Sequence, residues 1–70
     1  TADQRRAATV LHRALVAARG AADPEAVMRE VVAGEPRVEL DYAAERDGRL
    51  LIAARVGPVR LIDNLAREDR

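Results

Sequence analysis

Apolar and polar residues follow a helical period over the first twenty positions of the chain. Thr1 and Gln4 have the spacing of a capping box, and Asp3 suits the positive end of a helix dipole. Gly20 is a typical residue to end such a helix. At 100° per residue, one stripe contains Ala7, Ala8, Leu11, Ala14, Leu15 and Ala18. The pattern therefore predicts a helix between Thr1 and Gly20 whose Ala-rich face packs closely on a neighbour.

A second helix is predicted to begin after Asp23. Asp23 is a favourable cap, Pro24 suits the first helical position and Glu25 places an acid in the first turn. Gly34 followed by Pro36 is expected to stop this helix. Its apolar positions are Val27, Met28, Val31 and Val32. A methionine among valines is typical of filler in an irregular core, so no ligand role is assigned to it.

The period of the pattern changes to two after Arg37. The positions that share one face are Val38, Leu40, Tyr42 and Ala44, and the opposite face holds Glu39, Asp41, Ala43 and Glu45. This alternation predicts a half-buried strand. A second strand is expected from Arg49, and a third strand over residues 59–65 follows a turn at Gly57-Pro58. The register of the third strand is left open.

The turn around Asp47-Gly48 decides the register of the first hairpin. A two-residue loop would place Leu40 opposite Arg55 and bring an arginine onto the core face. A three-residue loop over residues 46–48 keeps that face apolar. It pairs Ala44 with Leu50, Tyr42 with Ile52, Leu40 with Ala54, Val38 with Val56 and Glu45 with Arg49. The pattern favours the three-residue loop and assigns Tyr42 to the core.

The predicted fold class is α+β: two helices packed on one face of a three-stranded antiparallel β-meander, in the order ααβββ. Residues 1–70 would form a single domain, with the charged tail over residues 67–70 expected to fray. Leu51 and Ala53 point away from the core face, and Ile62 is expected to join them. Aliphatic residues clustered on the second face of such a sheet indicate contact with another surface.

Size and composition limit what a domain of this kind can do. A core of 70 residues rarely supplies more than about 3–5 kcal/mol, and the absence of Cys excludes disulfides as support. The formal net charge is zero, with arginines scattered along the chain and one aromatic residue, which argues against a nucleic-acid binder. No apolar run approaches the length of a membrane span, so a cytoplasmic protein without a membrane partner is expected.

Few residues are candidates for chemistry, because there is no phosphate-binding glycine loop, no metal-ligand spacing and no nucleophile with a base. His12 lies beside the apolar stripe, near Arg5 and Arg19 on the wheel, and could contribute to an anion site. Without an acid partner it is assigned to a solvated basic flank. Asp41 and Asp63 would need a cleft to act as an acid–base pair. Asp63-Asn64 is instead expected to bond the local backbone.

Three short segments resemble the C-terminal domain of the pantothenate synthetase (pantoate–β-alanine ligase) family. They are Val38-Glu39-Leu40-Asp41-Tyr42, the run from Arg49 to Gly57, and Arg60-Leu61-Ile62-Asp63-Asn64. The first eight residues are similar to the helix that follows the Ser-Ser-Arg-Asn segment of that family. The resemblance extends over nearly the whole chain, with its parts in the same order. One departure is the connection over residues 46–48, which is usually longer in the family and begins with Asp-Pro.

The resemblance implies a lid domain rather than a complete enzyme. The family condenses pantoate with β-alanine through a pantoyl-adenylate, and its larger N-terminal domain, of nucleotidyltransferase type, uses ATP and Mg. That domain would be the partner of this chain, which would be an excised C-terminal lid. No family catalytic motif falls on these 70 residues, so no catalytic, cofactor-binding or metal residue is assigned. The chain alone is expected to bind no cofactor and to be inactive.

Two other functional interpretations are compatible with the sequence. The chain could be a free-standing module that pairs with another protein through its sheet, and self-association through the exposed sheet face is compatible with either interpretation. An independent enzyme is disfavoured, because catalytic groups usually occupy a pocket of roughly 300 Å³ or more.

Overall fold

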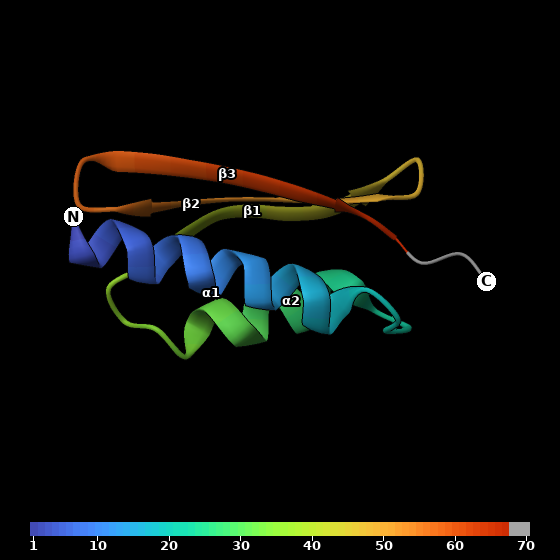
Figure 1. Ribbon diagram of the computed structural model, residues 1–70. Coiled ribbons are helices and arrows are strands. Elements are labelled where there is room, and N and C mark those ends of the chain that lie inside the picture. The colour runs from blue at the N-terminus through green and yellow to red at the C-terminus, as the bar shows by residue number, and fades with distance from the viewer. Residues whose placement is uncertain (68–70) are drawn as a thin grey trace.

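The structure is a computed structural model that describes residues 1–67. Two helices precede three strands: α1 (Ala2–Ala18), α2 (Pro24–Ala33), β1 (Glu39–Arg46), β2 (Arg49–Val56) and β3 (Val59–Ala66). The strands form one antiparallel sheet in the order β1-β2-β3. Both helices lie on the same side of this sheet, α1 against β2 and β3 and α2 against β1 (Figure 1). The predicted α+β class and the ααβββ order are confirmed.

Both helices begin at the residues that the sequence indicates. Thr1 accepts a hydrogen bond from the Gln4 backbone N–H through Oγ1 at 3.1 Å, and the Gln4 side chain completes the capping box. Asp23 caps α2 by accepting from the Ala26 N–H at 3.2 Å, with Pro24 at the first helical position. Each cap satisfies a backbone donor that has no partner within the helix.

The buried face of α1 differs from the predicted stripe at two positions. Val10 is buried, whereas Ala8 is exposed. The buried face of α1 is therefore centred nearer to Val10, and valine, which is larger than alanine, occupies the core. In α2, Met28 and Val32 are buried and Val27 and Val31 are partly buried, as predicted.

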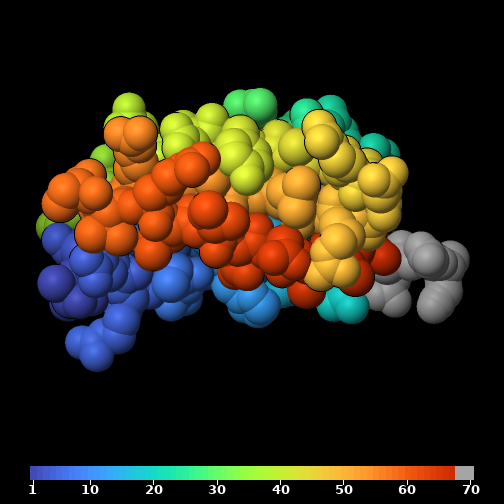
Figure 2. All heavy atoms as spheres, turned by 90° about the horizontal axis from the view of Figure 1, so that it is seen from above, coloured from blue at the N-terminus to red at the C-terminus, as the bar shows by residue number. Residues whose placement is uncertain are grey.

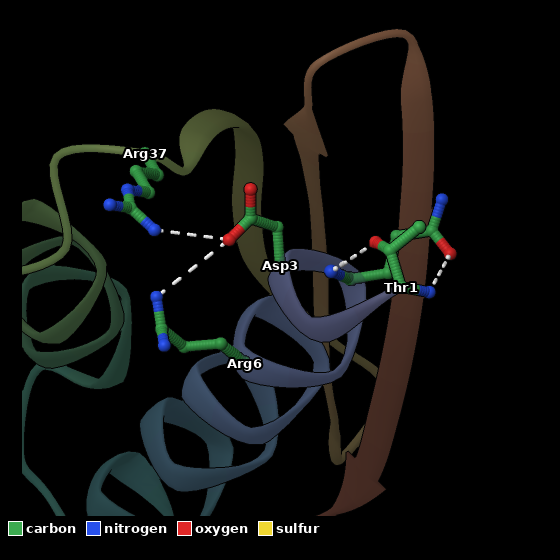
Figure 3. A network of polar contacts seen from close by, with 5 residues as sticks. Thr1, Asp3, Arg6 and Arg37 are labelled. Carbon is green, nitrogen blue, oxygen red and sulfur yellow. Dashed lines mark hydrogen bonds and ion pairs between the residues drawn. The ribbon is translucent and has the colours of Figure 1, made fainter.

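Asp3 connects the first turn of α1 to the segment that leads into β1. Its carboxylate accepts a hydrogen bond from Arg37 Nη1 at 3.0 Å and lies 3.7 Å from Arg6 Nη1 (Figure 3). All three side chains are more than half exposed, so each pair contributes little stability, about 1 kcal/mol at most. The contact joins the first turn of α1 to the segment between α2 and β1.

The three-residue loop predicted for the first hairpin is wrong. Arg46 pairs with Arg49, so that Asp47 and Gly48 alone form the turn. Both have a positive φ, 52° for Asp47 and 77° for Gly48, which is the conformation of a type I′ turn. The register of the outer half of β1 therefore differs by one residue from the prediction. The observed pairs there are Glu45 with Leu50, Ala44 with Leu51, Ala43 with Ile52 and Tyr42 with Ala53.

A β-bulge at Asp41 removes the difficulty that had argued against the two-residue turn. Leu40 still pairs with Ala54, because Asp41 is an extra residue between Leu40 and Tyr42 on β1. The bulge lets Leu40 face the helices while Tyr42 faces away from them. Tyr42 and Ala44, predicted to be in the core, are therefore on the outer side, and Ala43 is buried in their place.

The third strand is joined to β2 by a two-residue turn at Gly57-Pro58. Val56 pairs with Val59, and Gly57 has a φ of 59°, as the first position of a type II′ turn requires. Arg67 follows β3 and is bound in three ways: its N–H donates to the Gly48 carbonyl, and its guanidinium contacts Glu45 and the Ala21 carbonyl. The predicted fraying is thus wrong for Arg67, and residues 68–70 lie outside the described part.

The core is aliphatic and lies between the sheet and both helices. Its largest fully buried side chains are Leu11, Leu15, Met28, Val32, Leu50 and Ile52. Every buried side chain of this core is apolar among the residues that the structure describes. Within residues 1–67, neither helix is long and apolar enough to cross a membrane.

Candidate functional site: the outer face of the sheet

The side of the sheet opposite the helices is the main candidate for a functional surface. We call it the outer sheet face and define it by Tyr42, Ala44, Arg46, Arg49, Leu51, Ala53, Arg55, Arg60, Ile62 and Asn64, together with the bulged Asp41. Figure 2 looks onto this face, where side chains of the three strands form the surface and the helices appear only along its two long edges.

Apolar side chains occupy the middle of the outer sheet face. Ile62 is 63% exposed and Tyr42 is 38% exposed, so two of the three large exposed apolar side chains among the described residues lie on this face; the third is Val16 on α1. Ala53 is buried, because it pairs with Tyr42 on one side and with Ile62 on the other. The predicted orientation of Leu51, Ala53 and Ile62 away from the helices is confirmed.

A hollow of about 360 Å³ lies next to this apolar centre. It is lined by Tyr42, Ala44, Arg46 and Leu51. The bulge at Asp41 and the type I′ turn together create it, because they turn Tyr42 and Ala44 to the outer side opposite Ala53 and Leu51. This hollow was not predicted from the sequence, because the predicted register had placed Tyr42 and Ala44 among the core residues.

One end of the outer sheet face is held together by ion pairs around Asp41. Arg60 Nε donates to Asp41 Oδ2 at 2.9 Å, and Arg55 Nε lies 3.9 Å from the same oxygen. The Arg60 guanidinium is also 6.0 Å from the centre of the Tyr42 ring, at the outer limit of a cation–π contact. Arg60 thus reaches from β3 across β2 to β1, where Asp41 is its ion-pair partner.

The opposite end, beside the hairpin turn, is basic. Arg46 and Arg49 are direct cross-strand neighbours, an arrangement in which like charges repel. Arg49 Nη2 donates to the neutral Asn64 Oδ1 at 2.7 Å. Over residues 1–67 no acidic side chain forms an ion pair with either arginine. This end of the face therefore has positive charge available for an anionic group.

The structure gives His12 an acid neighbour that the sequence analysis did not expect. Asp63 Oδ2 is 4.0 Å from His12 Nδ1, and both side chains are substantially exposed. The negative charge of a carboxylate at this distance disfavours the binding of an anion by His12 together with Arg5 and Arg19. Asp63 Oδ1 accepts from the Asn64 N–H at 2.8 Å, which confirms the local backbone bond predicted for this pair.

The described residues offer a contact surface more than a reactive centre. No group of three or more His, Cys, Asp or Glu that could hold a metal ion occurs within residues 1–67. The hollow brings together one arginine, one phenol and two aliphatic side chains, without a carboxylate or imidazole on its wall. Such a lining suits an apolar group with a neighbouring negative charge.

Comparison with known proteins gives a consistent result, although no protein-family model matches the chain. The chain is 45% identical to a pantothenate synthetase of Rubrobacter xylanophilus, with 90% of this chain and 29% of that protein covered. A pantothenate synthetase of Saccharopolyspora erythraea is also 45% identical, with 89% and 26% covered. The crystal structure of pantothenate synthetase from Thermus thermophilus matches with a TM-score of 0.81 and 28% identity, over 99% of this chain and 32% of that one.

The chain thus spans about 30% of the length of the relatives that it matches. The compared stretch with the Rubrobacter protein is 85 residues long, more than the 70 residues of this chain. That relative therefore has residues within the stretch that have no counterpart here. The Thermus structure covers all five elements, so the additional residues are expected in a connection between them.

Proposed function

This chain is homologous to one segment of pantothenate synthetase over about 90% of its length, and we propose that it is the C-terminal lid domain of such a ligase. The reaction assigned to the whole ligase is the ATP-dependent condensation of pantoate with β-alanine through a pantoyl-adenylate. The observation that carries the proposal is the match of all five elements to the Thermus enzyme at a TM-score of 0.81.

The role proposed for the lid is to cover the reactive acyl-adenylate while the amine attacks it. Closing an active site excludes water, which would otherwise hydrolyse such an intermediate, and completes the arrangement of groups around the substrate. A covering domain needs a rigid shape more than reactive side chains. The tightly packed aliphatic core and the cross-strand ion pairs of this chain support that role.

ATP and Mg are assigned to the rest of the ligase. The side chains described here do not fit a nucleotide–metal site, because the hollow on the outer sheet face contains no carboxylate that could ligate Mg²⁺. No step of the reaction is therefore attributed to a residue of this chain. A cytoplasmic location, where ATP is abundant, is part of the same proposal.

A hybrid ligase tests the proposal. This chain would replace the matched segment of the Rubrobacter xylanophilus pantothenate synthetase, and pantothenate formation would be measured with ATP, pantoate and β-alanine. We expect the hybrid to be active, and a control that lacks the segment to lose roughly 100-fold or more in rate, as misplaced closure can cause. An inactive hybrid, beside an active unmodified Rubrobacter enzyme, would contradict the proposal.

A further inference from the structure

The area and the charges of the outer sheet face restrict what can cover it. Each strand has eight residues, so the face measures roughly 27 by 14 Å, or roughly 400 Å² on one side of a contact. A stable complex between separate proteins usually buries about 800 Å² on each partner. A contact between covalently linked domains can be as small as about 600 Å² in total. The area therefore suits a linked domain better than a second copy of the chain.

The charges of this face indicate the chemistry of its occupant. Arg55 and Arg60 share the carboxylate of Asp41, and Glu39 lies opposite Arg55 in the ladder, so both arginines have acidic neighbours on β1. Arg46 and Arg49 instead lie side by side without an acidic ion-pair partner among the described residues. Two like charges in direct cross-strand contact are unfavourable for the isolated hairpin. A carboxylate placed opposite them would relieve this repulsion, while aliphatic side chains would cover Ile62, Leu51 and the hollow beside Tyr42.

The helical side of the molecule lacks a comparable apolar centre among the described residues. The residues of α1 and α2 that face solvent are mainly charged or small, and Val16 is the one large apolar side chain exposed there among the described residues. The capping residues and the contact between Asp3 and Arg37 are also satisfied within the chain. The two sides therefore differ in how much large apolar side-chain surface they expose.

We propose that the outer sheet face is the surface by which this chain docks on the catalytic part of its ligase, onto an apolar patch with a carboxylate opposite Arg46 and Arg49. This inference rests on the proposed function and specifies which face of the lid is turned towards the rest of the enzyme. Ile62, Tyr42 and Leu51 form the apolar centre of the contact, and the two arginines fix its orientation.

Hydroxyl-radical footprinting with mass spectrometry tests the docking face. Oxidation of each side chain would be compared between the isolated 70-residue chain and the hybrid ligase. We expect the oxidation rates of Ile62 and Tyr42 to fall several-fold in the hybrid, while Val16 on the opposite side keeps its rate. Protection of Val16 without protection of Ile62 would overturn the proposal, and so would equal rates for all three side chains in the two proteins.

Variants separate docking from folding. Ile62→Glu is expected to return Tyr42 in the hybrid to the oxidation rate of the isolated chain, whereas the matched control Val16→Glu leaves Tyr42 protected. Both positions are largely exposed, so circular dichroism of the isolated chain should show little change in melting temperature for either variant. Continued protection of Tyr42 in the Ile62→Glu hybrid would contradict the assignment.

The charge of the face is tested separately. Reversing both arginines, Arg46→Glu with Arg49→Glu, is expected to abolish the protection of Tyr42, and the control Arg13→Glu on the helical side is expected to preserve it. Protection of Tyr42 that requires added ATP would instead indicate a nucleotide on this face and overturn the protein contact. Protection of Tyr42 in the hybrid that is lost when the hybrid is diluted from dimer to monomer in sedimentation would overturn the linked-domain occupant.

The two proposals fail in different ways. A hybrid that makes pantothenate but leaves Ile62 fully reactive rejects the docking face and keeps the lid function. A hybrid that protects Ile62 but makes no pantothenate rejects the lid function and keeps the docking face.

Discussion

Asp47 and Gly48 make the strongest conformational demand of any pair of neighbouring residues in the described part of this chain. Both have a positive φ, and their two-residue turn determines which side chains of β1 face the helices. Asparagine, aspartate and glycine tolerate this conformation, but a residue with an ordinary Cβ is strained there by about 1–2 kcal/mol. Exposed turns usually tolerate substitution, but this turn is expected to tolerate few residue types at positions 47 and 48.

Replacement of Gly48 by alanine tests this demand. The new Cβ has open space around it, so the expected loss of about 1 kcal/mol in the free energy of unfolding comes from the φ of 77° alone. Gly20→Ala is a matched control, because Gly20 also has open space but no positive φ. Urea denaturation of both variants measures the difference. Equal stabilities would contradict the role assigned to the turn.

The helices were predictable because their signals are local. The caps at Thr1 and Asp23 each act within three residues, and both hold in the structure. The hairpin register was not predictable in the same way, because the alternation of β1 shows no interruption in the sequence. The two-residue loop, which the pattern disfavoured, is the correct one, and the bulge at Asp41 restores the inward position of Leu40. A charged residue in a strand gives no clear signal that a bulge occurs there.

Deletion of Asp41 is the corresponding test for the strand. Leu40 and Tyr42 already pair with adjacent residues of β2, so removing the extra residue should leave every side chain on its present face. The expected loss is about 1 kcal/mol or less, from the exposed ion pairs with Arg60 and Arg55.

Deletion of Ala44 is the control for this experiment. It removes a regular strand residue, so β1 would turn Ala43 outwards and Tyr42 inwards, and we expect it to abolish cooperative urea unfolding. Loss of cooperative unfolding in the Asp41 deletion, or its retention in the Ala44 deletion, would show that Asp41 is not the extra residue of the strand.

At the scale of the whole molecule, the sequence predicted the side of the candidate site but not its shape. Leu51, Ala53 and Ile62 were assigned to the outer sheet face from alternation alone, and they lie there. The hollow depends on Tyr42 and Ala44, whose positions follow from the bulge, so it could not be derived without the structure. Arg67 likewise joins β1, the first turn and the loop after α1, contacts between segments that are distant in the sequence.

As a lid, this chain would cover a reaction whose nucleotide is held elsewhere in the ligase. Calorimetric titration of ATP with Mg²⁺ into the 70-residue chain tests it most directly, with the intact Rubrobacter relative as the positive control. We expect no saturable heat from the chain up to about 1 mM ATP, a concentration that would reveal a binding free energy of about −4 kcal/mol. Saturable binding of ATP by the isolated chain at micromolar concentration would contradict it.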